Sequence, residues 1–438
     1  MAFRLLLNLQ EVPPVSGLLK VSGAILFGLV LSAEAGASGT TTTTGKIKPH
    51  SAGTTHVATR STHAGASRTS AATRTHVTGH TATGHTATAV VAHGHSRGAR
   101  PTLAVRRTRY HEHFSASSFA DNLTLGDVVE GEDPVVRAAA IEALGNMNGT
   151  AIAIDPSSGR ILAMVNQKLA LSRGAEPCST IKLTVALAAL EEGIVSKDTP
   201  VNLGGRFHMT MTDALAHSNN LYFETLGRQL GFERVKHYAN EFGLGELAGY
   251  HISGEQLGTY PDEELPASLG GVGRMCSFGE SVSMTPLQLG ALVAAIANGG
   301  TLYYLQHPES AIDLATFEPK VKRTLDIAPL IPEISVGMEG AVEYGTARSL
   351  RANFSQFPVM GKTGTCSNNG TRFGWFGSYA DTPNGRIVTV FFLEGGRPTF
   401  GPKAAELTGE FYRALWDKSY FLPKTTVAGD GAVGASDF

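Results

Sequence analysis

The sequence has few cysteines and no long apolar run. Its three cysteines, Cys178, Cys276 and Cys366, exclude a disulfide scaffold and fit no zinc-ligand spacing, so at most one disulfide can form. No uncharged apolar run reaches the roughly 18 residues of a transmembrane helix, which excludes a polytopic membrane protein.

Acidic residues are missing from one long part of the chain. Between Ala35 and His111 there is no Asp or Glu, whereas ten Lys and Arg residues occur there. The formal charge of the 438 residues is nevertheless only −2, because the remainder is acidic. This near-neutral balance does not indicate a nucleic-acid partner, and the basic and acidic parts call for separate interpretation.

Residues 1–35 have the pattern of an export signal. Lys20 precedes a short apolar run, Val21 to Ala33, and Ala33-Glu34-Ala35 offers a cleavage site with small residues. The alternative is an uncleaved anchor, since the apolar character extends back to Val15 with only Lys20 interrupting it. We therefore expect residues 1–35 to be a signal peptide or a membrane anchor, and the protein to act outside the cytoplasm.

Residues 36–117 are rich in Thr, Ala, Gly, His and Ser and contain almost nothing to bury. Such a segment cannot offset its ordering entropy with a core, so we expect a disordered basic linker. Ten of the fifteen histidines lie before Phe114, but no rigid spacing among them indicates a metal site. Residues 425–438 are expected to form a flexible tail.

The remaining residues, 118–424, are predicted to form one folded unit. Alternating or apolar segments with turn residues between them predict strands over 150–154, 160–165, 359–366, 373–379 and 387–393. Helical spacing and caps predict helices over 133–144, 179–192, 219–230, 232–242, 286–297 and 403–416. This order predicts an α+β fold, in which an antiparallel five-stranded sheet is flanked by helices and lies beside an all-helical subdomain.

Three short motifs in this unit carry side chains suited to acyl transfer. In Ser179-Thr180-Ile181-Lys182, the serine and the lysine share one helix face, and the apolar surroundings disfavour the charged form of Lys182. A neutral amine there could take the proton of Ser179. The alternative is an ordinary capping serine with a lysine that reaches the surface.

The second motif, Ser218-Asn219-Asn220, opens the next predicted helix. Ser218 could relay a proton from Lys182, and Asn220 could hold a substrate amide, although this motif on its own is more typical of an ordinary N-cap. A second Ser-x-Asn, Ser367-Asn368-Asn369, shows that this tripeptide is not specific.

The third motif, Lys362-Thr363-Gly364-Thr365, lies on a predicted strand. Lys362 and Thr363 could bind a carboxylate, and Gly364 lets another backbone come close. Such a strand can accept an extended peptide as an extra strand. The alternative is the polar end of an edge strand.

The three motifs in this order resemble those of penicillin-binding proteins and serine β-lactamases. The surrounding sequence resembles the class B transpeptidase domain, notably at Glu176-Pro177-Cys178-Ser179, Thr285-Pro-Leu-Gln288 and Ala297-Asn-Gly-Gly300. Further landmarks of the family occur at Gly345-Thr346 and Gly374-Trp-Phe-Gly377.

The resemblance implies a penicillin-sensitive D,D-transpeptidase that acts on peptidoglycan stem peptides. Ser179 would form the acyl-enzyme, with Lys182 as base and Ser218 as relay. Lys362 and Thr363 would bind the terminal carboxylate, and the backbone N–H groups of Ser179 and Thr365 would form the oxyanion hole. β-Lactams would be covalent inhibitors, and no metal or organic cofactor would be needed.

The sequence departs from the family in three ways. Cys178 replaces the usual glycine before the nucleophile, the interval from Ser179 to Ser218 is short, and a predicted linker stands where class B members have a pedestal domain. Cys178 and Cys366 should both flank the cleft. The sequence leaves open whether they pair, and we expect free thiols rather than a disulfide. The rival functions are a D,D-carboxypeptidase, a serine β-lactamase or β-lactam sensor, and a non-catalytic wall-binding scaffold.

Overall fold

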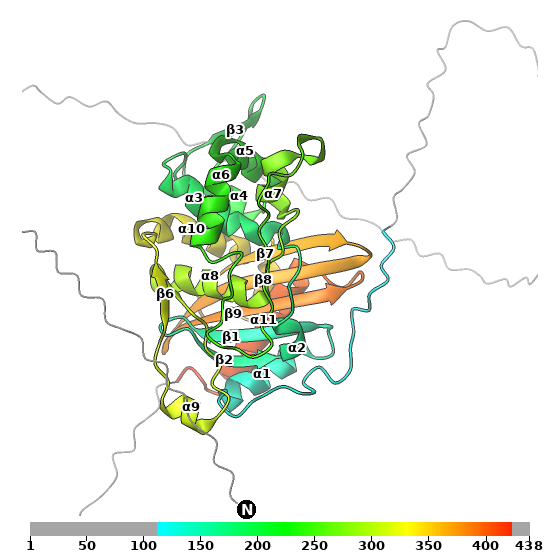
Figure 1. Cartoon of the computed structure of the whole chain (residues 1–438), viewed down its shortest axis with the longest axis vertical. Helices are drawn as coiled ribbons and strands as arrows, with labels where there is room; N and C mark the ends of the chain where they lie inside the picture. Colours follow the sequence, from blue (N-terminus) through cyan, green and yellow to red (C-terminus); the bar gives the residue numbers. More distant parts are fainter. Residues whose placement is uncertain (1–111, 423–438) are drawn as a thin grey trace, which may run out of the picture. The chain divides into compact units, whose positions relative to one another are not determined.

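The computed structural model describes residues 112–422, in which five strands form one antiparallel sheet (Figure 1). The strands lie in the order β2-β1-β9-β8-β7, which places β7 at an edge. Their bounds are Gly149–Asp155 (β1), Arg160–Val165 (β2), Val359–Asn368 (β7), Thr371–Thr382 (β8) and Gly385–Gly395 (β9). The predicted five-stranded antiparallel sheet is confirmed.

Successive residues of each central strand face opposite sides of the sheet, as the pleat requires. On β1, Ile152 and Ile154 join one apolar cluster, whereas Ala151 and Ala153 join a second cluster on the other face. Because both faces are buried, β1 and β9 are apolar almost throughout, rather than alternating with polar residues.

Helices cover both faces of the sheet. The second cluster contains residues of α1 (Pro134–Leu144) and α11 (Gly401–Asp417), and the first contains α8 (Pro286–Asn298). Two of these helices begin at a capping residue. The Asp133 side chain accepts hydrogen bonds from the first turn of α1, and Thr285 forms a capping box with Gln288 at the start of α8.

A helical subdomain lies beside the β7 edge (Figure 1). Its helices are α3 (Lys182–Glu191), α4 (Met211–Ala216), α5 (Asn220–Leu230), α6 (Phe232–Glu241), α7 (Gly271–Phe278) and α10 (Ile331–Glu343). Other short elements include α2 (Gln167–Ala170), α9 (Ala311–Ala315) and two hairpins, which pair β3 (Val201–Gly204) with β4 (Phe207–Met209) and β5 (Thr301–Tyr303) with β6 (Val321–Thr324). The sequence did not predict these short strands, nor α2, α4, α7, α9 and α10.

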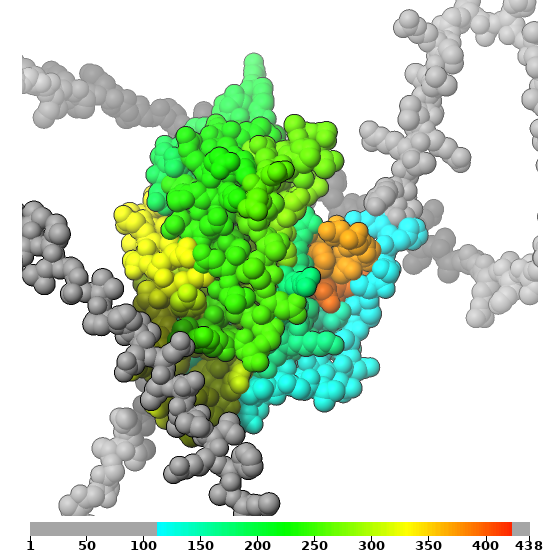
Figure 2. Space-filling model, viewed as in Figure 1, coloured from blue at the N-terminus to red at the C-terminus, as the bar shows by residue number. Residues whose placement is uncertain are grey.

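The predicted segments 1–35 and 425–438, and the predicted linker up to residue 111, lie outside the described residues. Residues 112–117 are described and lie beside the tip of the β7–β8 hairpin (Figure 2). There the backbone N–H of Ser115 donates to the carbonyl oxygen of Gly370 at 2.9 Å. Within residues 112–422, no helix has the length and apolar character needed to cross a membrane.

Candidate active site

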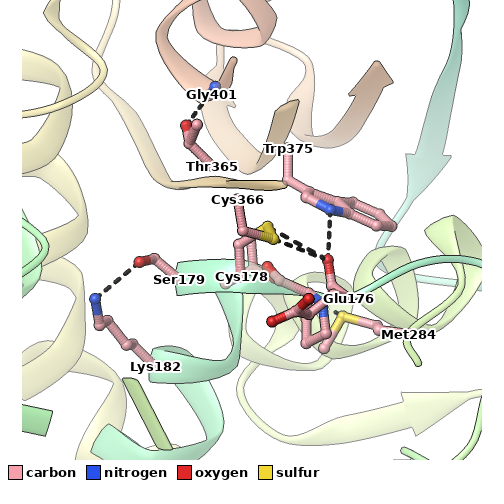
Figure 3. Close-up of a disulfide and its surroundings, with 11 residues drawn as sticks. Glu176, Cys178, Ser179, Lys182, Met284, Thr365, Cys366, Trp375 and Gly401 are labelled. Carbon is pink, nitrogen blue, oxygen red and sulfur yellow. Dashed lines mark hydrogen bonds between the residues drawn. A yellow bond between two sulfur atoms is a disulfide. The ribbon is translucent and has the colours of Figure 1, made fainter. Parts of the chain in front are cut away.

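Ser179 lies on a short 3-10 helix, Cys178–Ile181, which continues directly into α3. The sequence predicted one regular helix from residue 179, so its first turn is tighter than expected. The i, i+3 spacing nevertheless brings the two side chains together, as predicted. Lys182 Nζ donates a hydrogen bond to Ser179 Oγ at 2.8 Å (Figure 3).

Lys182 is fully buried at the start of a helix whose side chains are buried on every face. Its side-chain nitrogen also lies 2.7 Å from Asn220 Oδ1, 3.0 Å from the carbonyl oxygen of Ser218 and 3.2 Å from Ser218 Oγ. Desolvation, and then the charge of Lys362, hold the pKa of Lys182 well below its usual value. The site therefore favours a neutral amine that can accept a proton from Ser179.

Ser218 stands between α4 and α5 in a left-handed backbone conformation, with φ of 55°. It is not the cap of α5, because Asn219 takes that role and accepts a hydrogen bond from the backbone N–H of Tyr222. A non-glycine residue in this conformation is uncommon and costs energy. Here it places the Ser218 hydroxyl between two lysines, so the motif supplies both the N-cap of α5, at Asn219, and a serine that faces the two lysines.

The second lysine, Lys362, reaches Ser218 from β7. Its Nζ donates to Ser218 Oγ at 2.7 Å and to the carbonyl oxygen of Thr363 at 3.0 Å. The side chain is fully buried, and desolvation lowers the pKa of Lys362 to about 7. The structure thus brings together all three predicted motifs, with the Ser218 hydroxyl as their common point.

The rest of the β7 motif is held tightly by its neighbours. The hydroxyls of Thr346 and Thr363 lie 2.7 Å apart, and Thr365 Oγ1 accepts a hydrogen bond from the backbone N–H of Gly401 at 2.8 Å. A Cβ on Gly364 would lie 2.8 Å from the carbonyl oxygen of Pro177, which explains the glycine. Thr346 was not predicted to belong to the site, although the Gly345-Thr346 landmark includes it.

Cys178 and Cys366 form a disulfide, with Cα atoms 5.5 Å apart (Figure 3). The expectation of free thiols was therefore wrong. The two residues are 188 positions apart in the sequence, but the 3-10 helix that carries Ser179 packs against β7. Cys178 has a φ of 52°, a backbone conformation that glycine adopts more readily than other residues. Cys178 stands at the position where the family that the sequence resembles usually has a glycine. Cys276 is buried and remains a thiol.

Residues 149–413 match a family described as the penicillin binding protein transpeptidase domain. The chain is 30% identical over 258 residues to stage V sporulation protein D of Bacillus subtilis (strain 168), an alignment covering 49% of this chain and 39% of that protein. It is 22% identical over 340 residues to the peptidoglycan D,D-transpeptidase FtsI of Escherichia coli (strain K12), covering 69% and 54%. The matched part of the chain thus spans about half or less of the length of each of these two relatives.

Solved structures support the same fold. The D,D-transpeptidase domain of a peptidoglycan glycosyltransferase from Eggerthella lenta superposes with a TM-score of 0.51 at 20% identity. This superposition covers 65% of the present chain and 82% of the other. At this identity the likeness concerns the fold alone.

Proposed function

Since the chain belongs to the penicillin-binding protein transpeptidase family, we propose that it crosslinks peptidoglycan stem peptides through an acyl-enzyme on Ser179. The observation that carries this proposal is the 2.8 Å hydrogen bond from the buried Lys182 to Ser179. It pairs a hydroxyl nucleophile with an amine whose environment favours the neutral, proton-accepting form.

In the proposed reaction, Ser179 Oγ attacks the carbonyl carbon of the penultimate D-alanine while Lys182 takes the hydroxyl proton. The backbone N–H groups of Ser179 and Thr365 stabilise the oxyanion, and Lys362, with Thr363, binds the terminal carboxylate. The proton then passes through Ser218 to the leaving D-alanine nitrogen as the C–N bond breaks. The amine of a second stem peptide attacks the ester, forms the crosslink and returns the proton. Asn220 would hold the donor amide.

The site also accounts for penicillin binding, because a β-lactam offers a strained amide and a carboxylate to the same groups. The substrate lies outside the cytoplasm, and a structural disulfide fits an oxidising compartment. We therefore propose that the catalytic domain acts outside the cytoplasm, at or near the cell membrane.

A β-lactamase would need a base that activates water on the acyl-enzyme. Two glutamates of the segment between Ser218 and Lys362 hold backbone N–H groups instead. Glu255 accepts hydrogen bonds from the backbone N–H groups of Ala248 and Gly249, and Glu264 accepts one from Val272. These contacts make Glu255 and Glu264 poor candidates for that base.

The proposal is tested by product analysis and by the lifetime of the penicillin adduct. With purified muropeptides, we expect a crosslinked dimer and free D-alanine. Intact-mass measurement should show one penicilloyl group that lasts minutes or longer, and peptide mapping should place it on Ser179. Loss of the adduct within a second, with turnover of ampicillin, would identify a β-lactamase. Trimmed monomers without dimers would identify a carboxypeptidase.

The two lysines predict a bell-shaped pH dependence of acylation. The reaction with a carboxylate-bearing penicillin needs Lys182 neutral and Lys362 protonated in the free enzyme. Rising pH removes the Lys362 proton near its pKa of about 7. At pH values above this pKa, the second-order rate constant for acylation should fall by about tenfold per pH unit. Falling pH protonates Lys182 and produces the acid limb.

The two lysines interact, because both donate to the hydroxyl of Ser218. The apparent pKa values of the acid and alkaline limbs therefore describe the pair of lysines rather than either lysine alone. Stopped-flow acylation across the pH range measures the profile. A rate constant that stays level from neutral to strongly alkaline pH would contradict a charged Lys362 as the carboxylate partner.

A further inference from the structure

The proposed reaction has to bring a cation close to two buried lysines. Within residues 112–422 neither Lys182 nor Lys362 forms an ion pair, and their hydrogen-bond partners are hydroxyl, carbonyl and amide oxygens. The acceptor is an amine, and an aliphatic amine is protonated at neutral pH. Like charges repel, most strongly where water is scarce. The site therefore needs a group that favours the approach of an ammonium.

Glu224 supplies a carboxylate beside these lysines. It lies one turn along α5 from Asn220, whose Oδ1 accepts a hydrogen bond from Lys182 Nζ. Residues four apart share a helix face, and helical side chains lean toward the N-terminus, which aims Glu224 at the turn that carries Asn220. The charge of Glu224 reaches Lys182. Desolvation and the charge of Lys362 lower the pKa of Lys182, and the charge of Glu224 opposes them.

Glu224 is only weakly engaged by its neighbours. Its side chain is 25% exposed, and it pairs with Arg228 on the same helix at 3.5 Å. The Arg228 side chain is 53% exposed, and solvent-exposed pairs of this spacing contribute little. The facing helix α7 presents Gly273 there, where a Cβ would lie 3.4 Å from Glu224 Cβ and 2.9 Å from Arg228 Nη1. The carboxylate can thus exchange Arg228 for the cation of a ligand.

The α5 side of the nucleophile is open to a second peptide. Ser179, Asn220 and Glu224 are each partly exposed, whereas Lys182 and Lys362 are fully buried. In the proposed reaction the donor peptide occupies the β7 side, and its acyl group stays on Ser179. An incoming acceptor then has the α5 side, where Glu224 meets its ammonium before the lysines do.

We propose that Glu224 binds the ammonium group of the acceptor peptide and brings it to the acyl-enzyme on Ser179. The ammonium releases one proton to solvent, and the neutral amine forms a bond to the ester carbonyl carbon. Lys182 takes a second proton from the attacking nitrogen and gives it to Ser179 Oγ as the C–O bond breaks. Water is uncharged and gains nothing from Glu224, so the carboxylate favours crosslinking over hydrolysis. The inference rests on the proposed function, because it needs the same acyl-enzyme.

The test compares two nucleophiles on the same acyl-enzyme. One is an acceptor stem tetrapeptide blocked so that its single free amine carries its only charge, and the other is hydroxylamine, which is neutral at neutral pH. The full chain is loaded with a D-alanyl thioester donor, and the ratio of crosslinked product to hydroxamate is measured, so the acylation rate cancels. A hydrogen bond between charged groups is strong enough that this ratio should fall about tenfold in Glu224→Gln. In Glu224→Asp, which keeps the charge, the ratio should lie between the two values.

Three controls accompany this comparison. Arg228→Gln removes the competing cation and should keep the ratio at or above the wild-type value. Glu233→Gln, an exposed glutamate on α6, should leave the ratio unchanged. In the wild type, rising salt should lower the ratio because it screens the ammonium, and this readout needs no variant to fold.

The outcomes separate the inference from the proposed function. A ratio unchanged in Glu224→Gln, equal losses with both nucleophiles, or a wild-type ratio indifferent to salt would overturn the inference and leave the acyl-enzyme in place. A selective loss of hydrolysis in Glu224→Gln would also overturn it, because Glu224 would then activate water. Absence of penicillin labelling in the wild-type chain would overturn the proposed function itself.

Discussion

In the Lys182→Ala variant, acylation of Ser179 by penicillin should slow by roughly 10²–10⁴-fold, the range that a positioned general base contributes. Lys182 is the group that donates to Ser179 Oγ, and its burial holds it in a state that can accept the proton. Without it, the Ser179 hydroxyl has no base at hydrogen-bond distance among the described residues. Stopped-flow labelling measures the loss, with Ser179→Ala defining the signal without a nucleophile.

Two controls separate catalysis from folding. Lys168→Ala removes an exposed lysine on α2 and should acylate normally. Lys182→Met keeps the volume of the buried side chain and should be as slow as Lys182→Ala while unfolding closer to the wild-type temperature. If Lys182→Met acylates within about tenfold of the wild-type rate, another group is the base. Lys362→Ala should instead weaken mainly the binding of carboxylate-bearing drugs.

Loss of the Cys178–Cys366 disulfide should lower the free energy of unfolding by about 3–5 kcal/mol. The crosslink joins residues 188 positions apart, so it restricts the unfolded chain strongly. It should also slow acylation, because Cys178 directly precedes the nucleophile, whose N–H is proposed to bind the oxyanion. Denaturant titration of Cys366→Ser against the oxidised wild type measures the stability, and penicillin labelling measures the rate.

A reductant provides the internal comparison. It should destabilise the wild type and a Cys276→Ala variant, which both keep the disulfide, and should have no effect on Cys366→Ser. A wild type whose unfolding midpoint is indifferent to a strong reductant would show that the disulfide does not stabilise the domain.

The sheet and its covering helices were predictable because their signals are local. The apolar segments over 150–154 and 387–393 are bounded by turn residues, and Asp133 caps the helix that follows it. The Ser179–Lys182 contact was equally accessible, since helical geometry alone brings residues i and i+3 together. The order of the predicted strands and helices then indicated an antiparallel sheet beside a helical subdomain, but not the order of the strands within the sheet.

Other features depend on contacts between distant segments and were missed. No local pattern marks the left-handed conformation of Ser218, which follows from the way α4 and α5 meet beside Lys182 and Lys362. The disulfide and the Thr346–Thr363 contact likewise arise only when the chain has folded around β7. Short elements such as α7 and the β3–β4 hairpin have too few residues for a clear period.

The first apolar cluster runs without interruption from the sheet into the helical subdomain. It includes Ile154 of β1, Leu289 of α8, Leu187 of α3 and Phe223 of α5. A hinge between the two parts would have to open this shared interior to water. The packing therefore holds Ser179, Lys182, Ser218 and Lys362 in fixed positions relative to one another, and under the proposed function a donor peptide would meet groups that are already assembled.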